Sequence, residues 1–370
     1  MSIFPTHNEL EIAANIAVTQ VLGLKKDEGF LIITNPEEDV SQISMALYNA
    51  AVKQGAKPVL VYQQQKSQLD FAEESVIGAI HKAPAVVVSM SANKLGKDIH
   101  ALEKPFDHKG KKFDHVFTYY LRGNKSIRSF WSPGVTKDIF IRTVPIDYPR
   151  LREEAASIKI IIDRATGVRV TAPAGTDLYI GLKGRKAMKD DGEFSQPGSG
   201  GNVPCGEVFA SPALGTSKGI IAFDGSISLF DKTILINEPI RCTISDGFVV
   251  DISGGEEADG LADTISKGRE NAKSMAEEGK LPADKKEEYM TNASNLGELG
   301  IGLNPKATIT GNMLEDEKAY RTCHIAIGSN YDGDANALIH LDGLIKEPTI
   351  TAIFEDGSEQ VFVKDGDLVL

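Results

Sequence analysis

The sequence has few cysteines and no apolar run long enough to cross a membrane. Its three cysteines, Cys205, Cys242 and Cys323, lack the short pair spacings of a disulfide framework or a zinc knuckle, which predicts a reducing compartment. No apolar stretch approaches the roughly 20 residues that span a bilayer. The first residues, MSIFPTHNELEIAANIA, show no basic segment followed by a long apolar one, so we expect a cytoplasmic protein.

The chain also lacks an excess of basic residues. It carries 52 acidic and 40 basic residues, a formal net charge of −12 at pH 7. This balance disfavours a phosphate backbone or an anionic membrane, so we expect neither nucleic acid nor membrane as a partner. The 370 residues, 41% of them hydrophobic, can bury a full core and correspond to about two domains at roughly 100 to 200 residues each.

The first part of the sequence alternates apolar strands with helices, which predicts an N-terminal α/β domain (residues 1–150) with a mostly parallel sheet. Such continuous apolar strands are buried on both faces. The expected helices cover residues 8–23, 43–55 and about 70–82. The expected strands cover residues 30–35, 58–63, 84–91 and 116–121.

Beyond a boundary near residues 145–155 the pattern changes to short alternating segments separated by glycine turns, several of them Asp-Gly. We therefore expect a C-terminal α+β domain (residues 151–370) with a mainly antiparallel sheet. A charged amphipathic stretch, residues 256–291, interrupts the hairpins and predicts a solvated helix pair split at Pro282.

Three segments of the second part share one design when each is treated as a strand with alternating faces. They are GELGIGL (297–303), CHIAIG (323–328) and IHLDG (339–343). One face of each carries polar residues beside glycine or alanine, and the other face is apolar. The polar side chains of this face are Glu298, His324, His340 and Asp342. The small neighbours are expected to leave room for an ion and a substrate.

Two imidazoles and two carboxylates on such strands favour zinc, cobalt or manganese over calcium, which prefers oxygen ligands alone. Glu207 is a further candidate because Gly206 lets the backbone turn sharply just before it. Three carboxylates would supply −3 against the +4 of two divalent ions, which suits a paired-metal hydrolase. The predicted metal site lies in the C-terminal domain.

Each of these residues also has an ordinary interpretation. Acidic and histidine residues on strands are usually exposed or hydrogen-bonded, and Glu207 taken alone is more often a solvated loop residue. Cys205 and Cys323 could join the histidines in a structural zinc site, although alternation turns Cys323 away from His324. The glycine-rich loop at 198–206 lacks the Lys-Ser/Thr of a phosphate loop.

Four segments in sequence order, NVPCGEVFASP, LGELGIGLNPKA, LEDEKAYRTCHIAIGSNYDGDA and HLDGLI, resemble the aminopeptidase T / aminopeptidase S family of metallopeptidases. The resemblance covers most of the chain and is strongest from 200 to 345. It implies a thermophilic metalloprotease-like fold, a homodimer, and two divalent ions (zinc, cobalt or manganese). The implied ligands are Glu207, Glu298, His324, His340 and Asp342.

The resemblance further implies a metal-dependent aminopeptidase that acts on peptides with a free N-terminus, with Tyr331, Glu207 and Glu298 in catalytic roles. In such an enzyme the metals polarise the scissile carbonyl and activate a water. The chain is shorter than the founding members, and the segment between His324 and His340 is compressed, which affects substrate access.

Two alternatives remain at the level of the sequence. The same superfamily includes ring-cleaving dioxygenases of the dihydroxypyridine type, which keep the late histidines and aspartate around a single iron. A triad of two histidines and one carboxylate suits such an iron. Glu207 and Glu298 favour the aminopeptidase, because the dioxygenase gives them no necessary task. The second alternative is a non-catalytic, metal-stabilised binding protein, which would need a closed pocket. The glycine-lined strand faces argue against such a pocket.

Overall fold

The computed structural model describes residues 7–67 and 70–370. The chain forms two compact units. Unit 1 comprises the described residues up to Arg152 together with Asp190–Cys205, and unit 2 comprises Glu153–Lys189 and Gly206–Leu370. The division expected at residue 150 assigns Asp190–Cys205 to the second domain. This segment instead groups with unit 1, because strand β10 (Gly200–Asn202) pairs with β6 (Arg128–Trp131).

Unit 1 is built on a parallel sheet, as the sequence predicted. Within the described residues it has five strands in the order β10-β6-β3-β1-β2, and every pairing is parallel. The remaining strands are β1 (Gly29–Thr34), β2 (Lys57–Tyr62) and β3 (Val86–Met90), with a separate hairpin of β4 (Phe106–His108) and β5 (Lys111–Phe113). The helices are α1 (His7–Ile16), α2 (Glu38–Lys53), α3 (Glu74–His81), α4 (Ile99–Glu103), α5 (Val116–Thr118) and α6 (Lys137–Thr143), with π-helical turns η1 (Ala17–Val21) and η2 (Tyr119–Gly123).

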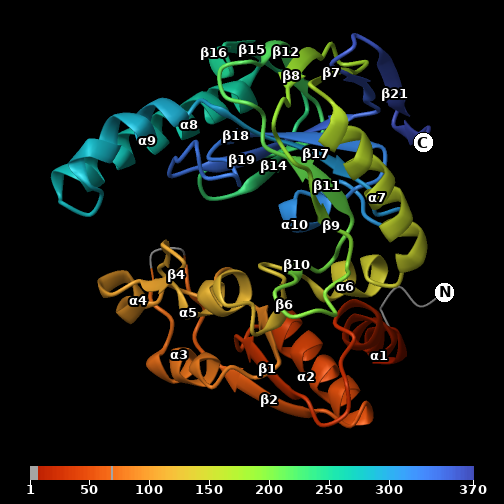
Figure 1. The fold of residues 1–370 in the computed structure, drawn as a ribbon, viewed down its shortest axis with the longest axis vertical. Helices are drawn as coiled ribbons and strands as arrows, with labels where there is room; N and C mark the ends of the chain where they lie inside the picture. Colours follow the sequence, from red (N-terminus) through yellow and green to blue (C-terminus); the bar gives the residue numbers. More distant parts are fainter. Residues whose placement is uncertain (1–6, 68–69) are drawn as a thin grey trace. The chain divides into compact units, whose positions relative to one another are not determined.

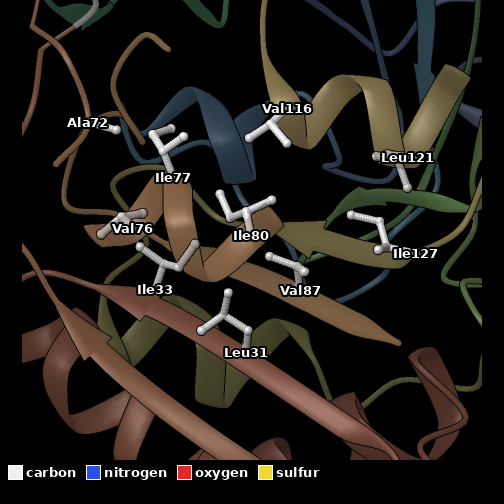
Figure 2. Packing of buried hydrophobic residues seen from close by; sticks show 10 residues of the cluster. All are labelled: Leu31, Ile33, Ala72, Val76, Ile77, Ile80, Val87, Val116, Leu121 and Ile127. Atoms are coloured by element: carbon white, nitrogen blue, oxygen red, sulfur yellow. The ribbon is translucent and has the colours of Figure 1, made fainter. Parts of the chain in front are cut away.

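The strand predicted at residues 116–121 is wrong. This segment forms α5 and η2, and β6 takes the fourth place in the parallel sheet instead. The His115 side chain accepts a hydrogen bond from the Phe117 N–H and so caps the helical turn. Val116 and Leu121, which strand alternation would place on opposite faces, both pack into the same buried cluster above the sheet (Figure 2).

Unit 2 contains two larger sheets whose recorded pairings are antiparallel, which confirms the predicted α+β character. The first has the order β14-β13-β19-β18-β17-β11-β9 and the second β16-β15-β12-β8-β7-β20-β21-β22. The strands of the first sheet are β9 (Met188–Asp190), β11 (Glu207–Ala210), β13 (Ser226–Ser228), β14 (Thr233–Leu235), β17 (Leu296–Gly302), β18 (Thr322–Gly328) and β19 (His340–Lys346).

The second sheet combines hairpins of strands adjacent in sequence with pairings between strands far apart in sequence. Its strands are β7 (Gly167–Thr171), β8 (Asp177–Gly181), β12 (Lys218–Phe223), β15 (Ile240–Ser245), β16 (Phe248–Ser253), β20 (Thr349–Ile353), β21 (Glu359–Lys364) and β22 (Asp367–Leu368). The helices associated with unit 2 are α7 (Tyr148–Arg164), which begins in unit 1, α8 (Glu256–Glu277), the 3₁₀ turn η3 (Ala283–Lys285), α9 (Lys286–Asn292) and α10 (Met313–Asp316). The predicted helix pair is confirmed, since Pro282 separates α8 from η3 and α9.

Among the helices of the described residues, none combines the length and the apolarity that a membrane crossing requires.

Candidate metal site

The three strands predicted to carry polar ligands lie side by side in the first sheet of unit 2. β18 pairs with β17 on one side and with β19 on the other (Figure 1). In this register Ala326 lies opposite both Glu298 and Asp342, so the two carboxylates flank one alanine. The alternation of the sequence therefore places polar side chains from neighbouring strands on one face of the sheet.

Gly300 explains how a histidine ring fits on this crowded face. Gly300 lies opposite His324 in the register, and a Cβ added to it would stand 1.9 Å from the Nε2 atom of His324. The sequence analysis expected the small residues to leave room for an ion and a substrate. At Gly300 the room is taken by the imidazole itself, and at Gly302 and Gly328 by backbone carbonyls of adjacent chain segments.

Glu207 reaches the same face from strand β11, where it lies opposite Gly302 of β17. Gly206, which precedes it, has a φ of +132°, and a Cβ there would stand 2.8 Å from the Cβ of Asn304. Only glycine tolerates both this conformation and this close approach. Glu207 itself is only 6% exposed, so it is not the solvated loop residue of the ordinary interpretation.

Glu298 is the central carboxylate of the site. Its Oε1 atom lies 3.3 Å from Nε2 of His324, and its Oε2 atom lies 3.2 Å from Nε2 of His340. The same Nε2 atom of His340 lies 3.3 Å from Oδ1 of Asp342. Donor atoms about 3 Å apart have the spacing of ligands that are each bonded to one ion at roughly 2.0–2.2 Å.

The orientation of His340 is fixed from behind. Its Nδ1 atom lies 2.8 Å from the carbonyl oxygen of Ser329, to which it can donate a hydrogen bond. This bond leaves Nε2 as the nitrogen that faces the carboxylates. A histidine held in this way by a backbone carbonyl is a common arrangement around protein-bound metals.

The five predicted ligands fall into two groups of side chains that could hold a metal ion. One group consists of Glu207, Glu317 and His324, and the other of Glu298, His340 and Asp342. Within the described structure, the buried Oε2 atoms of Glu207 and Glu298 make no hydrogen bond of good geometry, although each lies within 3.6 Å of a histidine Nε2 atom. Buried carboxylate oxygens without such partners fit a cation, because a buried anion is costly unless something pairs with it.

The pKa shifts express the excess of negative charge at the site. Burial by itself would lower the pKa of His324, but the hydrogen bond to Glu298 and the nearby carboxylates raise it to about 9. Burial acts to raise the pKa of Asp342, and the charge and hydrogen bond of His340 lower it to about 2. Burial is the main cause that raises the pKa of Glu317 to about 8. The carboxylates thus increase the affinity of the imidazoles for a cation, here a proton.

Two charged residues of the site were missed by the sequence analysis. Glu317 belongs to one of the two groups, and Lys318 is fully buried with its Nζ atom 2.7 Å from Oε1 of Glu207 and in contact with Oε1 of Glu317. Both lie in the charged run EDEK (315–318), which by pattern resembles a solvated turn. Their position just ahead of the strand that carries His324 was the available clue.

Tyr331, predicted to be catalytic, lies beside the metal-capable residues. Its ring centroid is 5.2 Å from that of His340 and 5.2 Å from that of Phe209, edge-on in both cases. The residue is 60% exposed. Phe209 and Tyr331 thus form a short aromatic wall next to His340.

The cysteines take no part in either metal-capable group of the described residues. Cys323 is buried on the apolar side of β18, and burial raises the pKa of its thiol. The Cys205 thiol donates a hydrogen bond to the carbonyl oxygen of Asn202. The alternative of a structural zinc site built on these two thiols is not supported by this arrangement.

Comparison with known proteins first defines the class of fold. The solved structure of 2,5-dihydroxypyridine dioxygenase from Pseudomonas putida KT2440 superposes with a TM-score of 0.71 at 17% identity, covering 99% of this chain and 98% of that one. Wild-type AmpT from Thermus thermophilus superposes with a TM-score of 0.67 at 19% identity, covering 98% and 99%. The chain has the two-part α/β fold that these two proteins share.

Sequence comparison then defines the family. The family model of NicX, 2,5-dihydroxypyridine 5,6-dioxygenase, matches residues 135–343, which is more than half of the chain. The chain belongs to this family. The 2,5-dihydroxypyridine 5,6-dioxygenase of Pseudomonas putida KT2440 is 29% identical over 127 residues. That match spans 34% of this chain and about a third, 35%, of the relative.

The predicted aminopeptidase is therefore wrong, and with it the classification as a hydrolase or protease. The likeness to AmpT is real but lies in the fold, whereas the family and the named relative are dioxygenases. The prediction of an aminopeptidase relied on the assumption that Glu207 and Glu298 have a role only in a two-metal hydrolase. The structure gives Glu207 a different neighbour, the buried ammonium group of Lys318. The predicted homodimer and the predicted compartment stay predictions.

Proposed function

We propose that this chain is a ring-cleaving dioxygenase that acts on a dihydroxypyridine and depends on a single iron ion. The observation that carries the proposal is the NicX family match over residues 135–343, a segment that contains all the metal-capable residues described above. The reaction takes up one dioxygen and breaks a carbon–carbon bond of the ring. Both oxygen atoms enter the ring-opened product, so the ring supplies the electrons and no further reductant is needed.

The donor set fits an iron of this kind. Glu298, His340 and Asp342 would hold the ion, and His324, whose Nε2 atom lies 3.3 Å from Oε1 of Glu298, would supply the second imidazole. Together they offer two imidazoles and two carboxylates, which include the set of two histidines and one carboxylate that non-haem iron oxygenases use. When bound, the iron supplies the redox chemistry that allows dioxygen to react with an aromatic ring.

The protein's own residues account for orientation and substrate shape. Ser329 holds His340 so that Nε2 faces the carboxylates. The aromatic wall of Phe209 and Tyr331 stands beside His340 and offers a ring surface to a planar substrate. We therefore expect flat hydroxylated aromatic rings to bind here in preference to flexible chains.

The test is oxygen consumption by protein from which all metal has been removed and to which ferrous iron has been restored under anaerobic conditions. With 2,5-dihydroxypyridine we expect uptake of one dioxygen per ring and a product whose mass equals that of the substrate plus two oxygen atoms. His340→Ala serves as the ligand control and should consume none. Absence of oxygen uptake by correctly folded, iron-loaded protein with any dihydroxypyridine would refute the proposal.

A further inference from the structure

We propose that the buried ammonium group of Lys318 occupies the place of a second cation and thereby limits the site to one divalent ion. This inference rests on the proposed function, in which a single iron acts, but it concerns the number of ions and not the reaction. It also explains why a site with two metal-capable groups need not hold two metals.

The first step is the contact between Lys318 and one of these groups. The lysine Nζ atom lies 2.7 Å from Oε1 of Glu207 and also contacts Oε1 of Glu317. These two carboxylates are members of the group that includes His324. Lys318 is 0% exposed, so its charge is neutralised by the protein alone. An ion placed between Glu207 and Glu317 would meet this ammonium at close range.

The second step is that the lysine is held in place by its backbone. The Lys318 N–H donates to the carbonyl oxygen of Glu315 at 2.9 Å, and the Lys318 carbonyl accepts from the Asn304 N–H at 2.8 Å. Asn304 in turn accepts from the N–H of Tyr320 at 3.1 Å, and Asn304 forms a β-bridge with Ala319. The ammonium is therefore carried by an anchored segment that cannot withdraw it without breaking several backbone hydrogen bonds.

The third step is the contrast with the other group. Among the described residues, the ion pairs that Glu298 and Asp342 make within 4 Å are with His324 and His340, and the charge of Lys318 acts on Asp342 only as a weaker, more distant influence. No lysine or arginine of the described structure thus forms a direct ion pair with this group. A divalent ion is expected to bind here, where its charge is needed.

The experiment counts metal. Metal-free protein is exposed to excess cobalt, desalted, and analysed for cobalt per chain, and the count is repeated with ferrous iron under anaerobic conditions. We expect one ion in the wild-type protein and in Lys318→Arg, which keeps the charge. We expect two ions in Lys318→Met, which keeps the apolar stem but exposes Glu207 and Glu317 to a second ion. Lys159→Met is the matched control, because Lys159 of unit 2 is also paired with a carboxylate, that of Asp163; it should hold one ion.

Two ions in the wild-type protein, or one ion in folded Lys318→Met, would overturn the proposal. If Lys318→Met folds only with two ions supplied, the proposal is supported. If it does not fold at all, Lys318→Gln decides. That variant removes the charge but keeps a hydrogen-bonding group toward Glu207 and Glu317, so it should hold two ions, and one ion in the folded protein would overturn the proposal.

The outcome is separable from that of the proposed function. One ion per chain without oxygen uptake would refute the dioxygenase and leave the role of Lys318 intact. Two ions per chain with oxygen uptake would do the reverse.

Discussion

Replacing Gly300 by alanine should disturb the site through a single methyl group. The new Cβ would stand 1.9 Å from Nε2 of His324 and 2.2 Å from its Cε1 atom. The first distance is about 1.5 Å short of the 3.4 Å at which ordinary contact begins. His324 is 1% exposed and lies on the central strand between β17 and β19, so its ring cannot turn aside freely. The clash must be relieved by moving the ring or by separating the strands.

Overpacking of a buried site of this kind costs about 1–3 kcal/mol. We therefore expect Gly300→Ala to lower the free energy of unfolding by about that amount, measured by urea denaturation. Because His324 would supply one imidazole to the ion, its displacement should also lower iron affinity by at least the roughly 10–100-fold seen when groups that orient metal ligands are lost. Affinity is measured by anaerobic titration in conditions where the variant is shown to be folded.

Gly260→Ala is the matched control, because Gly260 lies in helix α8 of the same unit and the atom nearest to an added Cβ, Cδ1 of Leu229, is 3.4 Å away. Alanine is favoured over glycine in a helix by up to about 1 kcal/mol, so this variant should be as stable as the wild type or more stable. Gly300→Ala with unchanged stability and unchanged iron affinity would refute the assignment of Gly300 as the space for the imidazole.

Three further expectations follow. Asp342→Asn should reduce iron affinity by more than the roughly 10–100-fold loss typical of an outer-shell group, as measured by metal titration; undiminished affinity would remove Asp342 from the ligand set. Tyr331→Ala should weaken iron binding more than Tyr331→Phe, because the recorded contact with His340 is made by the ring; equal effects would contradict this. Burial acts to raise the pKa of Glu28, but hydrogen bonds from the Arg128 side chain and the Lys25 N–H outweigh it and leave this pKa below its ordinary value of 4.5. The Glu28–Arg128 pair therefore stabilises unit 1 above pH 4.5, and this contribution is lost as the pH falls through the lowered pKa. Glu28→Gln should lower the free energy of unfolding by about 2–3 kcal/mol at neutral pH and flatten the acid side of the profile of unfolding free energy against pH. An unchanged profile would be evidence against this role of the pair.

Much of the fold could be predicted because the hydrophobic periodicity of the strands is clear in the sequence. The continuous apolar strands of unit 1 and the alternating strands of unit 2 gave the correct sheet types, and the polar face of residues 297–343 was located by alternation alone. The segment 116–121 was misassigned because its aromatic and β-branched residues favour a strand. The hydrogen bond by which His115 caps this segment depends on local geometry, and it stabilises the helical turns instead.

The candidate site was only partly predictable. Ligand types at alternating positions on strands could be recognised, but the burial of Lys318 could not, because a lysine in a charged run is exposed in most proteins. The structural role of Gly300, which leaves space for the imidazole of His324, could not be predicted either. It depends on the residue opposite it across β17 and β18, and that register is not visible in the sequence.

A motif of ligands in a fixed order specifies donor atoms but not the charge they must balance. The order that suggested a peptidase here skips residue 318, which lies between the second glutamate and the first histidine of the motif. Two proteins can therefore share both a fold and a ligand order and still differ in the number of cations that the site accepts. On this argument the residue beside the first glutamate separates the chemistries. A buried lysine there favours one ion and an open coordination sphere, whereas a neutral residue leaves the carboxylate free to bind a second metal.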